Sequence, residues 1–326
     1  MSEILKRKFN VGIGKESSRG VAVAPSFWLK PTSEEYNDAV EVKATERSMG
    51  QIEDSDDQVV IKNFSNGTIA GEVFDKSFGV LLLAALGQVS SVQKSAPNTG
   101  VYDHTYSVLQ SAQHPSLTLE IKRGDIEQKA YPLCVIDNLK LSASVNEYIN
   151  FEVSLRGKGG SASVSEPVYV EENYFLSKHI GVKLAANYAG LGAASEIDVR
   201  SLELTISKNI EDKDLLSNDG PSDFLNKQVS IEGSLEMYFS GVYERDYALN
   251  GDAKAMQIVL ENTGVTIGSN VHPKLVINLA KVKFSEPMIT GGNNDLAKIA
   301  VKFKGLFSLT DGKSIEAILT NGQSSY

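Results

Sequence analysis

The stretch SNGTIAGEVFDKSFGVLLLAALG, residues 65–87, decides the fold of this chain. From residue 69 to residue 74 successive side chains fall on opposite faces, which is typical of a strand with one buried face. Asp75 then offers an N-cap, apolar residues follow at helical spacing, and Gly87 can end the helix. We therefore predict a strand that delivers a short apolar helix onto its own sheet.

A second stretch repeats this plan in the other half of the chain. Apolar residues alternate from Val229 to Phe239, and after a loop Asp252 can open a helix that ends at Gly264. The two predicted strands are centred on Ile69 and Ile231, which lie close to half a chain length apart. We interpret the two stretches as the hubs of two related domains.

Other segments recur in the same order, which indicates an internal duplication. A chain of 326 residues suits two domains of about 150 residues each. The recurring segments are 40–54 with 197–212, 116–124 with 274–284, and 147–159 with 295–307. We expect an N-terminal arm over 1–35, a first domain over 36–160, a linker over 161–190 and a second domain over 191–326.

The remaining pattern favours a mainly β fold. Between residues 139 and 155, and again from 202 to 207, apolar and polar side chains alternate cleanly. Such alternation is typical of antiparallel sheets with one dry and one wet face. With two helices against about a dozen strands, we predict an all-β or α+β protein of two tandem sandwich or barrel domains, each with one packed helix. The polar stretches 207–227 and 285–295 are expected to be long loops.

Composition argues against several classes of protein. The net charge of −9 argues against a nucleic-acid-binding protein, which requires a continuous basic surface to neutralise phosphates. Cys134 is the only cysteine, so no intrachain disulfide can form. The first residues lack the apolar core of a signal peptide, and the longest apolar run, Val80–Leu86, is too short to span a bilayer. We therefore expect a protein that is made and kept under cytoplasm-like conditions.

No motif for catalysis or metal binding emerges. The four histidines lie far apart, with no acid at ligand spacing. Cys134 lies in an apolar run and is better interpreted as a buried small residue than as a nucleophile. GIGKES at 12–17 lacks the Walker spacing, and the acidic clusters at 53–57 and 211–214 lack the spacing of an EF-hand. We expect neither an enzyme nor a bound cofactor or metal.

A family resemblance is carried by several segments together. GKESSRGVAVAP, FWLKP, SMGQIED and the stretch at 65–87 resemble, in this order, the major tail tube proteins of long-tailed, siphovirus-type bacteriophages. Four segments of the second half are similar to the same group, namely SLELTISKNIED, KQVSIEGSLEMYF, LVINLAKVKFSEP and SIEAILTNGQSSY. The likeness covers nearly the whole chain and is one of pattern and order. It implies two tandem tail-tube-type β domains and a structural role in the virion tail.

The resemblance also implies how the protein assembles. Tube subunits form rings that stack around the tape measure protein and end at terminator and tip proteins, and DNA leaves through the bore without specific binding. Two domains per chain imply a trimeric ring with pseudo-sixfold symmetry, whereas a single tube domain per chain implies a hexameric ring. Assembly is expected in the cytoplasm of the bacterial host, with no membrane partner.

The size of such a tube follows from sheet geometry. If each of six domains offers about four strands, about 24 strands tilted by about 40° enclose a backbone diameter of about 48 Å. Side chains leave a bore of about 38 Å, which admits a DNA duplex. Because the dry face turns to the domain core, the polar face turns to the lumen. The candidate lumen residues are Glu120, Glu152, Glu203, Glu232 and Glu236. Basic residues also fall on wet strand faces, so the wall is not expected to be uniformly acidic.

Assembly also requires contacts between chains and between rings. The N-terminal arm is expected to lie either on its own domain or on a neighbouring subunit. The candidate contacts between subunits or rings are Phe9, Trp28, Met49, Asp54 and Asp57. The alternative from another class is a β-rich binding module, such as an adhesin or a baseplate component. That alternative requires an aromatic platform, and the single Trp28 lies in the arm instead.

Overall fold

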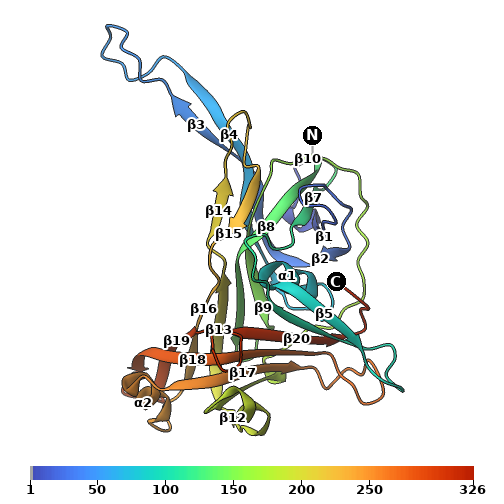
Figure 1. Cartoon of the computed structure of the whole chain (residues 1–326), viewed down its shortest axis with the longest axis vertical. Coiled ribbons are helices and arrows are strands. Elements are labelled where there is room, and N and C mark those ends of the chain that lie inside the picture. Colours follow the sequence, from blue (N-terminus) through green and yellow to red (C-terminus); the bar gives the residue numbers. More distant parts are fainter. Residues whose placement is uncertain (1–2) are drawn as a thin grey trace.

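The computed structural model describes residues 3–326, apart from the side chains of residues 243 and 244, and confirms a mainly β protein (Figure 1). The first half contains β1 (Phe9–Lys15), β2 (Phe27–Leu29), β3 (Pro31–Ala44), β4 (Gln58–Glu72), α1 (Phe78–Leu86), β5 (Gly87–Gln93), β6 (Tyr102–Val108), β7 (Leu117–Arg123), β8 (Glu127–Ser144), β9 (Asn150–Gly157) and β10 (Ser161–Ala162). The second half contains β11 (Ile180–Ala185), β12 (Glu196–Ile197), β13 (Val199–Ser207), β14 (Ile210–Lys213), β15 (Asp223–Asn226), β16 (Ser230–Tyr238), α2 (Tyr243–Asn250), β17 (Ala253–Glu261), β18 (Lys274–Thr290), β19 (Lys298–Gly305) and β20 (Ile315–Asn321). Short 3₁₀ helices cover Lys6–Lys8, Ser177–His179 and Tyr188–Ala193.

The hub stretch folds as predicted, with one correction. The end of β4 buries alternate residues, and every residue of α1 is buried. Gly87 ends the helix with a φ of 96°, in the left-handed region that favours glycine. The N-cap position is Ser77 and not Asp75. Asp75 accepts hydrogen bonds from the backbone and side-chain nitrogens of Asn173, both at 2.8 Å, and so ties the segment after β10 to the hub.

Eight antiparallel strands form one continuous sheet, hereafter the inner sheet. Their order is β3-β4-β9-β8-β13-β16-β19-β18. Four strands therefore come from each half of the chain, and the halves meet where β8 pairs with β13. This middle junction runs from the pair Ser144 and Ser201 to the pair Asn138 and Ser207. Strands β8, β13 and β16 of the inner sheet run along the long axis of the molecule in Figure 1.

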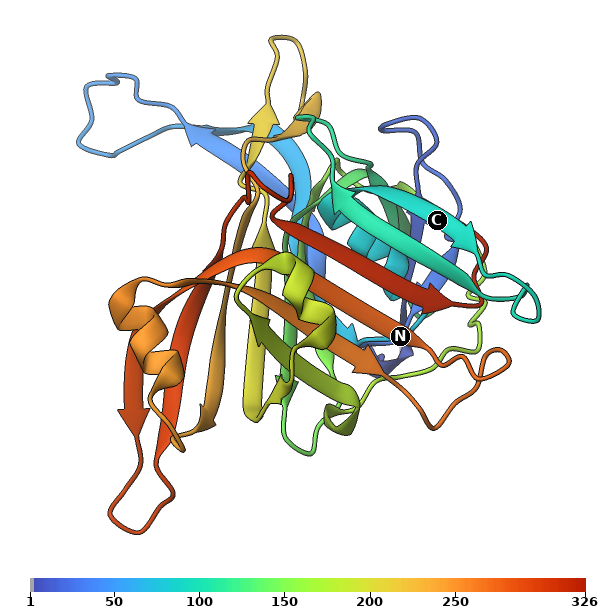
Figure 2. The same cartoon turned by 60° about the horizontal axis from the view of Figure 1, so that its bottom comes forward.

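Two long strands, β8 and β18, bend out of the inner sheet and build an outer layer. The first part of β8 pairs with β7 and β10, and β7 continues to β1 and β2. The first part of β18 pairs with β17 and β20, and β17 continues to β11 and β12. β20 also pairs with β6, so the hairpin β5–β6 joins the outer layer of the second half (Figure 2). The apolar core, with α1 inside it, lies between the layers.

Three local predictions are wrong. Residues 253–261, predicted as a helix, form β17, because Met256, Ile258 and Leu260 satisfy a period of two and are fully buried that way. The helix of this half, α2, lies just before them. The stretch expected as a loop over 207–227 holds the hairpin β14–β15. The stretch expected as a loop over 285–295 is a strand up to Thr290, because β18 continues to pair with β19 there.

The strand pairing repeats between the two halves with the same register. Leu141 lies opposite Phe151 in β8–β9, and Ile289 lies opposite Ile299 in β18–β19. The numbering offset between the halves is therefore 148 for both strands (289 − 141 and 299 − 151). Each of the two strands β8 and β18 also contains a β-bulge, that is, one extra residue relative to its hairpin partner. The bulge lies between residues 136 and 138 in β8 and between residues 285 and 288 in β18. We call the repeated strands the first unit (9–157) and the second unit (180–305).

The correspondence includes the strands expected in the N-terminal arm and the linker. β1 pairs with β7 so that Ile13 faces Leu119, and β11 pairs with β17 so that Leu184 faces Met256. β2 beside β1 likewise matches β12 beside β11. Residues 9–29 therefore belong to the outer layer of their own chain.

The longest hairpins of the two units are equivalent as well. Val42 pairs with Val60 in β3–β4, and Ile210 pairs with Asn226 in β14–β15. The offsets are 168 (210 − 42) and 166 (226 − 60). We call residues 40–61 the first hairpin and residues 208–227 the second hairpin. The first hairpin projects away from the body of the molecule (Figure 1).

Candidate assembly surfaces

Both ends of the inner sheet are open edges. β3 pairs with β4 on one side only, and among the described residues its other side has no strand partner. At the opposite end, β18 pairs with β19 up to Thr290, whereas β17 accompanies its other side only as far as Lys283. An unpaired edge is a template for another strand. On β3 two edge groups are capped by side chains in the isolated chain, since the N–H of Tyr36 donates to Glu34 at 3.0 Å and its carbonyl accepts from Arg123 at 2.6 Å. The chain therefore presents one open edge from each unit.

Burial differs sharply between the middle junction and these open edges. Leu141, at the junction, is 3% exposed, whereas its equivalent Ile289, at the β18 edge, is 48% exposed. Lys208, in the second hairpin, is 0% exposed, whereas its equivalent Val40, in the first hairpin, is 54% exposed. Equivalent positions are thus covered inside the chain and bare at its ends.

The wet face of the inner sheet carries four of the five predicted glutamates. Glu152 lies opposite Lys140 on β8, and Glu203, Glu232 and Glu236 lie on β13 and β16. Three of them have basic partners: Lys140 to Glu203 at 2.9 Å, Lys304 to Glu232 at 2.9 Å, and Arg200 to Glu236 at 3.5 Å. This face is therefore a mixed and partly paired charge surface.

Glu120 does not belong to this face, which corrects the expectation of an exposed position. It lies on β7 in the outer layer and is 1% exposed. Its carboxylate accepts hydrogen bonds from Gln128 at 2.6 Å and from Ser163 at 2.7 Å. The segment after β10 covers it, a tertiary contact that strand alternation does not reveal.

The predicted contact residues fall into two groups. Met49, Asp54 and Asp57 are exposed in the tip of the first hairpin. Phe9 is half-buried at the start of β1, and Trp28 is 4% exposed on β2. The ring of Trp28 is therefore part of the outer layer of its own chain, which corrects the expectation for this residue.

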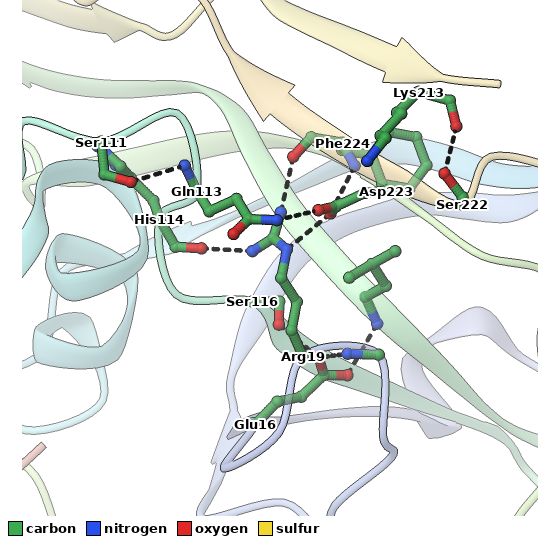
Figure 3. A network of polar contacts seen from close by, with 12 residues as sticks. Glu16, Arg19, Ser111, Gln113, His114, Ser116, Lys213, Ser222, Asp223 and Phe224 are labelled. Carbon is green, nitrogen blue, oxygen red and sulfur yellow. Dashed lines mark hydrogen bonds and ion pairs between the residues drawn. The ribbon is translucent and has the colours of Figure 1, made fainter. Parts of the chain in front are cut away.

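The second hairpin is clasped onto the first unit by a polar network (Figure 3). Arg19 donates to the carboxylate of Asp223 at 2.6 Å, to the carbonyl of Phe224 at 2.6 Å and to the carbonyl of His114 at 2.5 Å. Gln113 donates to the other oxygen of Asp223 at 2.6 Å. One guanidinium thus joins three separate segments of the chain.

Glu16 holds the loop that carries Arg19. Its buried carboxylate accepts hydrogen bonds from the backbone of Gly20 at 2.7 Å and of Leu133 at 2.8 Å. Two hydroxyls, of Ser116 and Thr118, complete its shell at 2.5 and 3.0 Å. A buried carboxylate needs such partners, and here they fix the position of the clasp.

Apolar and ionic contacts complete the clasp. The ring of Phe224 is fully buried against Leu133 and Val135, where β8 bends, and Ile210 packs on the same cluster. The carboxylate of Asp212 forms ion pairs with Lys62 and with Arg156, both at 2.8 Å.

A buried lysine closes the base of the second hairpin. Lys208 Nζ donates to the carbonyl of Ala84, near the end of α1, at 2.7 Å. Burial, reinforced by the positive charge of Arg19, lowers the pKa of Lys208 to about 7. Burial also lowers the pKa of His114 to about 4, with Lys208 as the second cause. Both groups are thus held largely neutral above pH 7 inside the joint between units.

Sequence reasoning missed several of these residues. Glu35 is exposed on the wet face of β3 at the position equivalent to Glu203. The structural offset of 168 between the two units makes Glu35 the equivalent of Glu203. The sequence comparison, which matches residue 40 with residue 197, uses an offset of 157 and therefore misses it. Of the clasp residues, Arg19 lies in the loop between β1 and β2 and Asp223 begins β15. Both occur in polar stretches without a motif, and no local signal indicates their pairing.

Two β units that share one antiparallel sheet with open edges define a mainly β protein. The family model for the phage tail tube protein matches residues 8–305, so the chain belongs to the phage tail tube protein family. Membership makes it a structural component of a phage tail. A comparison with curated protein sequences finds no significant match. Among the described residues no helix is long and apolar enough to cross a membrane, and no cluster of three potential metal ligands occurs.

Proposed function

We propose that this protein is the major tail tube subunit, and that its chains join edge to edge into rings which stack into a conduit for DNA. Each chain contributes an eight-stranded inner sheet with an open edge at either end. Three chains then close a barrel of about 24 strands with pseudo-sixfold symmetry, because each chain holds two equivalent units. The observation that carries this proposal is the middle junction, where the second unit already pairs with the first through β8 and β13.

The middle junction supplies the register of the proposed contact between chains. At that junction Thr205 lies opposite Lys140. The offsets, 168 for β3 and 148 for β8, convert this pair into Asn37 of one chain opposite Met288 of the next. The proposed interface is therefore β3 of one chain against the C-terminal part of β18 of the next, so that the antiparallel sheet continues from chain to chain.

The wet face then lines the bore. Its carboxylates repel phosphates, and mobile ions screen that repulsion beyond a Debye length of about 8 Å at physiological salt. The paired bases lower the net negative charge of the wall and weaken the repulsion further. Glu35, Glu152, Glu203, Glu232 and Glu236 are the proposed acidic lumen residues. A wall of mixed and internally paired charge offers DNA no continuous basic track to bind.

Electron microscopy of the purified full chain tests this proposal. The wild type is expected to form rings or hollow rods, and native mass measurement of single rings is expected to give three chains. Ile289→Lys places a charge on the open edge and is expected to leave folded, dispersed chains. The matched control, Leu296→Lys, lies in the exposed loop after β18 and is expected to assemble like the wild type.

Three outcomes would contradict the proposal. Dispersed globules from the wild type would favour the binding-module alternative. Rings of six chains would refute the trimeric ring. Normal tubes from Ile289→Lys would show that β18 is not the edge that joins chains.

A further inference from the structure

We propose that the first hairpin clasps the second unit of the neighbouring chain in the same ring, as the second hairpin clasps the first unit within the chain. The inference rests on the proposed ring and adds to it a docking surface on β18, β19 and β16. Its occupant is residues 40–61 of a second copy of this chain.

The internal clasp is the template. There the second hairpin covers the bend of β8 with Phe224 and Ile210, and its Asp212 meets Arg156 of β9 and Lys62 of β4. The backbone N–H of Asn63 also donates to the carbonyl of Asp219 in the hairpin tip, at 2.6 Å. The second hairpin therefore reaches across three strands of the unit whose edge it joins.

The first hairpin lacks such cover within its own chain. Its apolar side chains are exposed on both faces, which is unfavourable for a projecting two-stranded ribbon in water. The exposed fractions are 54% for Val40, 47% for Val42, 51% for Val59, 54% for Val60 and 50% for Ile61. Val42 is the equivalent of Ile210, which packs on the cluster at the bend of β8.

The residues of the proposed docking surface on the second unit are identified by the same offset of 148. Leu133, Val135 and Arg156 of the first unit correspond to Lys281, Lys283 and Lys304 of the second. Lys283 and Lys304 are exposed, and Lys281 is half-buried. The proposed docking surface on the second unit thus lies at the position equivalent to the internal contact on the first unit. It carries lysines where the internal contact has the apolar side chains of Leu133 and Val135.

The charge of the first hairpin complements this change. Residues 41–57 contain six acids and two bases, a net charge of −4. The acids are Glu41, Glu46, Glu53, Asp54, Asp56 and Asp57. An acidic hairpin and a lysine-bearing bend attract each other and disfavour the wrong pairing of a first hairpin with a first unit.

Cysteine cross-linking of the assembled full chain tests the proposal. Gln58 is the equivalent of Phe224 (224 − 166), so the pair Gln58→Cys and Lys283→Cys is expected to link with a short bis-maleimide. Because a ring closes, the covalent ladder on a denaturing gel is expected to stop at three chains. Each single-cysteine variant serves as control and is expected to give no ladder, since Cys134 is buried.

A second pair separates this inference from the proposed ring. Asn37→Cys with Met288→Cys lies in the proposed edge register, where directly opposite residues are within disulfide reach. If the edge pair links and the hairpin pair does not, the hairpin inference is overturned and the ring stands. If hairpin links extend the ladder beyond three chains, the hairpin joins successive rings and the inference is again overturned. If neither pair links, the ring itself is refuted.

Discussion

The two hairpins show how one backbone pairing meets two environments. The second hairpin is sealed by Arg19, Phe224 and Asp212 against the first unit, whereas the first hairpin, paired in the same register, stands bare in the isolated chain. The sheet edges beneath them differ in the same way. The chain thus contains one joint between its two units, and we propose that its two ends form an equivalent joint between neighbouring chains.

The largest expected effect comes from opening the internal clasp. Phe224→Ala removes a fully buried ring and leaves a cavity beside Leu133 and Val135, so the free energy of unfolding is expected to fall by about 3–5 kcal/mol. Urea denaturation followed by fluorescence measures it. Leu216→Ala, in the exposed tip of the same hairpin, is the control and is expected to change stability by less than about 0.5 kcal/mol. Equal effects at both positions would show that the hairpin does not hold the units together.

Lys208 gives the next effect, with a sign that depends on pH. Its folded pKa of about 7 lies below the unfolded value, so the wild type gains stability as pH rises from 7 towards 10.5. Lys208→Met has two opposing effects at pH 7. It removes the cost of burying an amine that is charged in the unfolded state, and it leaves the carbonyl of Ala84 without its hydrogen-bond donor. The first effect is the larger, so the variant is expected to be more stable at pH 7 by about 2 kcal/mol. Near pH 10 the order is expected to reverse. A constant difference between the two proteins across this range would contradict the assignment.

His114 gives a smaller effect on the acid side. Its folded pKa of about 4 lies below the unfolded value, so the unfolded state takes up the proton first and stability falls as pH drops from 6.5 to 4. The expected loss is about 2.5 kcal/mol over this window. His114→Gln can still donate to the carbonyl of Leu109 and is expected to lose this part of the pH dependence. Parallel stability curves for the two proteins would exclude His114 as the cause.

Local pattern predicts much of this fold, because alternation and capping are properties of neighbouring residues. The end of β4, α1 with Gly87 behind it, and the wet-face glutamates of β9, β13 and β16 were all predictable in this way. β17 was not, since its apolar spacing satisfies both a helix and a strand, and only its pairing with β18 selects the strand. Glu120 and Trp28 required knowledge of the outer layer, which covers them from segments distant in sequence.

The smallest effect on the isolated chain is the most informative about assembly. Val42→Ser is expected to change the free energy of unfolding by less than about 0.5 kcal/mol, because half of the side chain already contacts water. Its equivalent Ile210→Ser is expected to cost more than about 1 kcal/mol, because Ile210 packs on the buried cluster around Phe224. In electron micrographs Val42→Ser is nevertheless expected to lower the yield of rings, while Ile210→Ser acts on folding first. If Val42→Ser assembles like the wild type, the first hairpin does not repeat the contact of the second, and the equivalence of the two hairpins ends at their backbone.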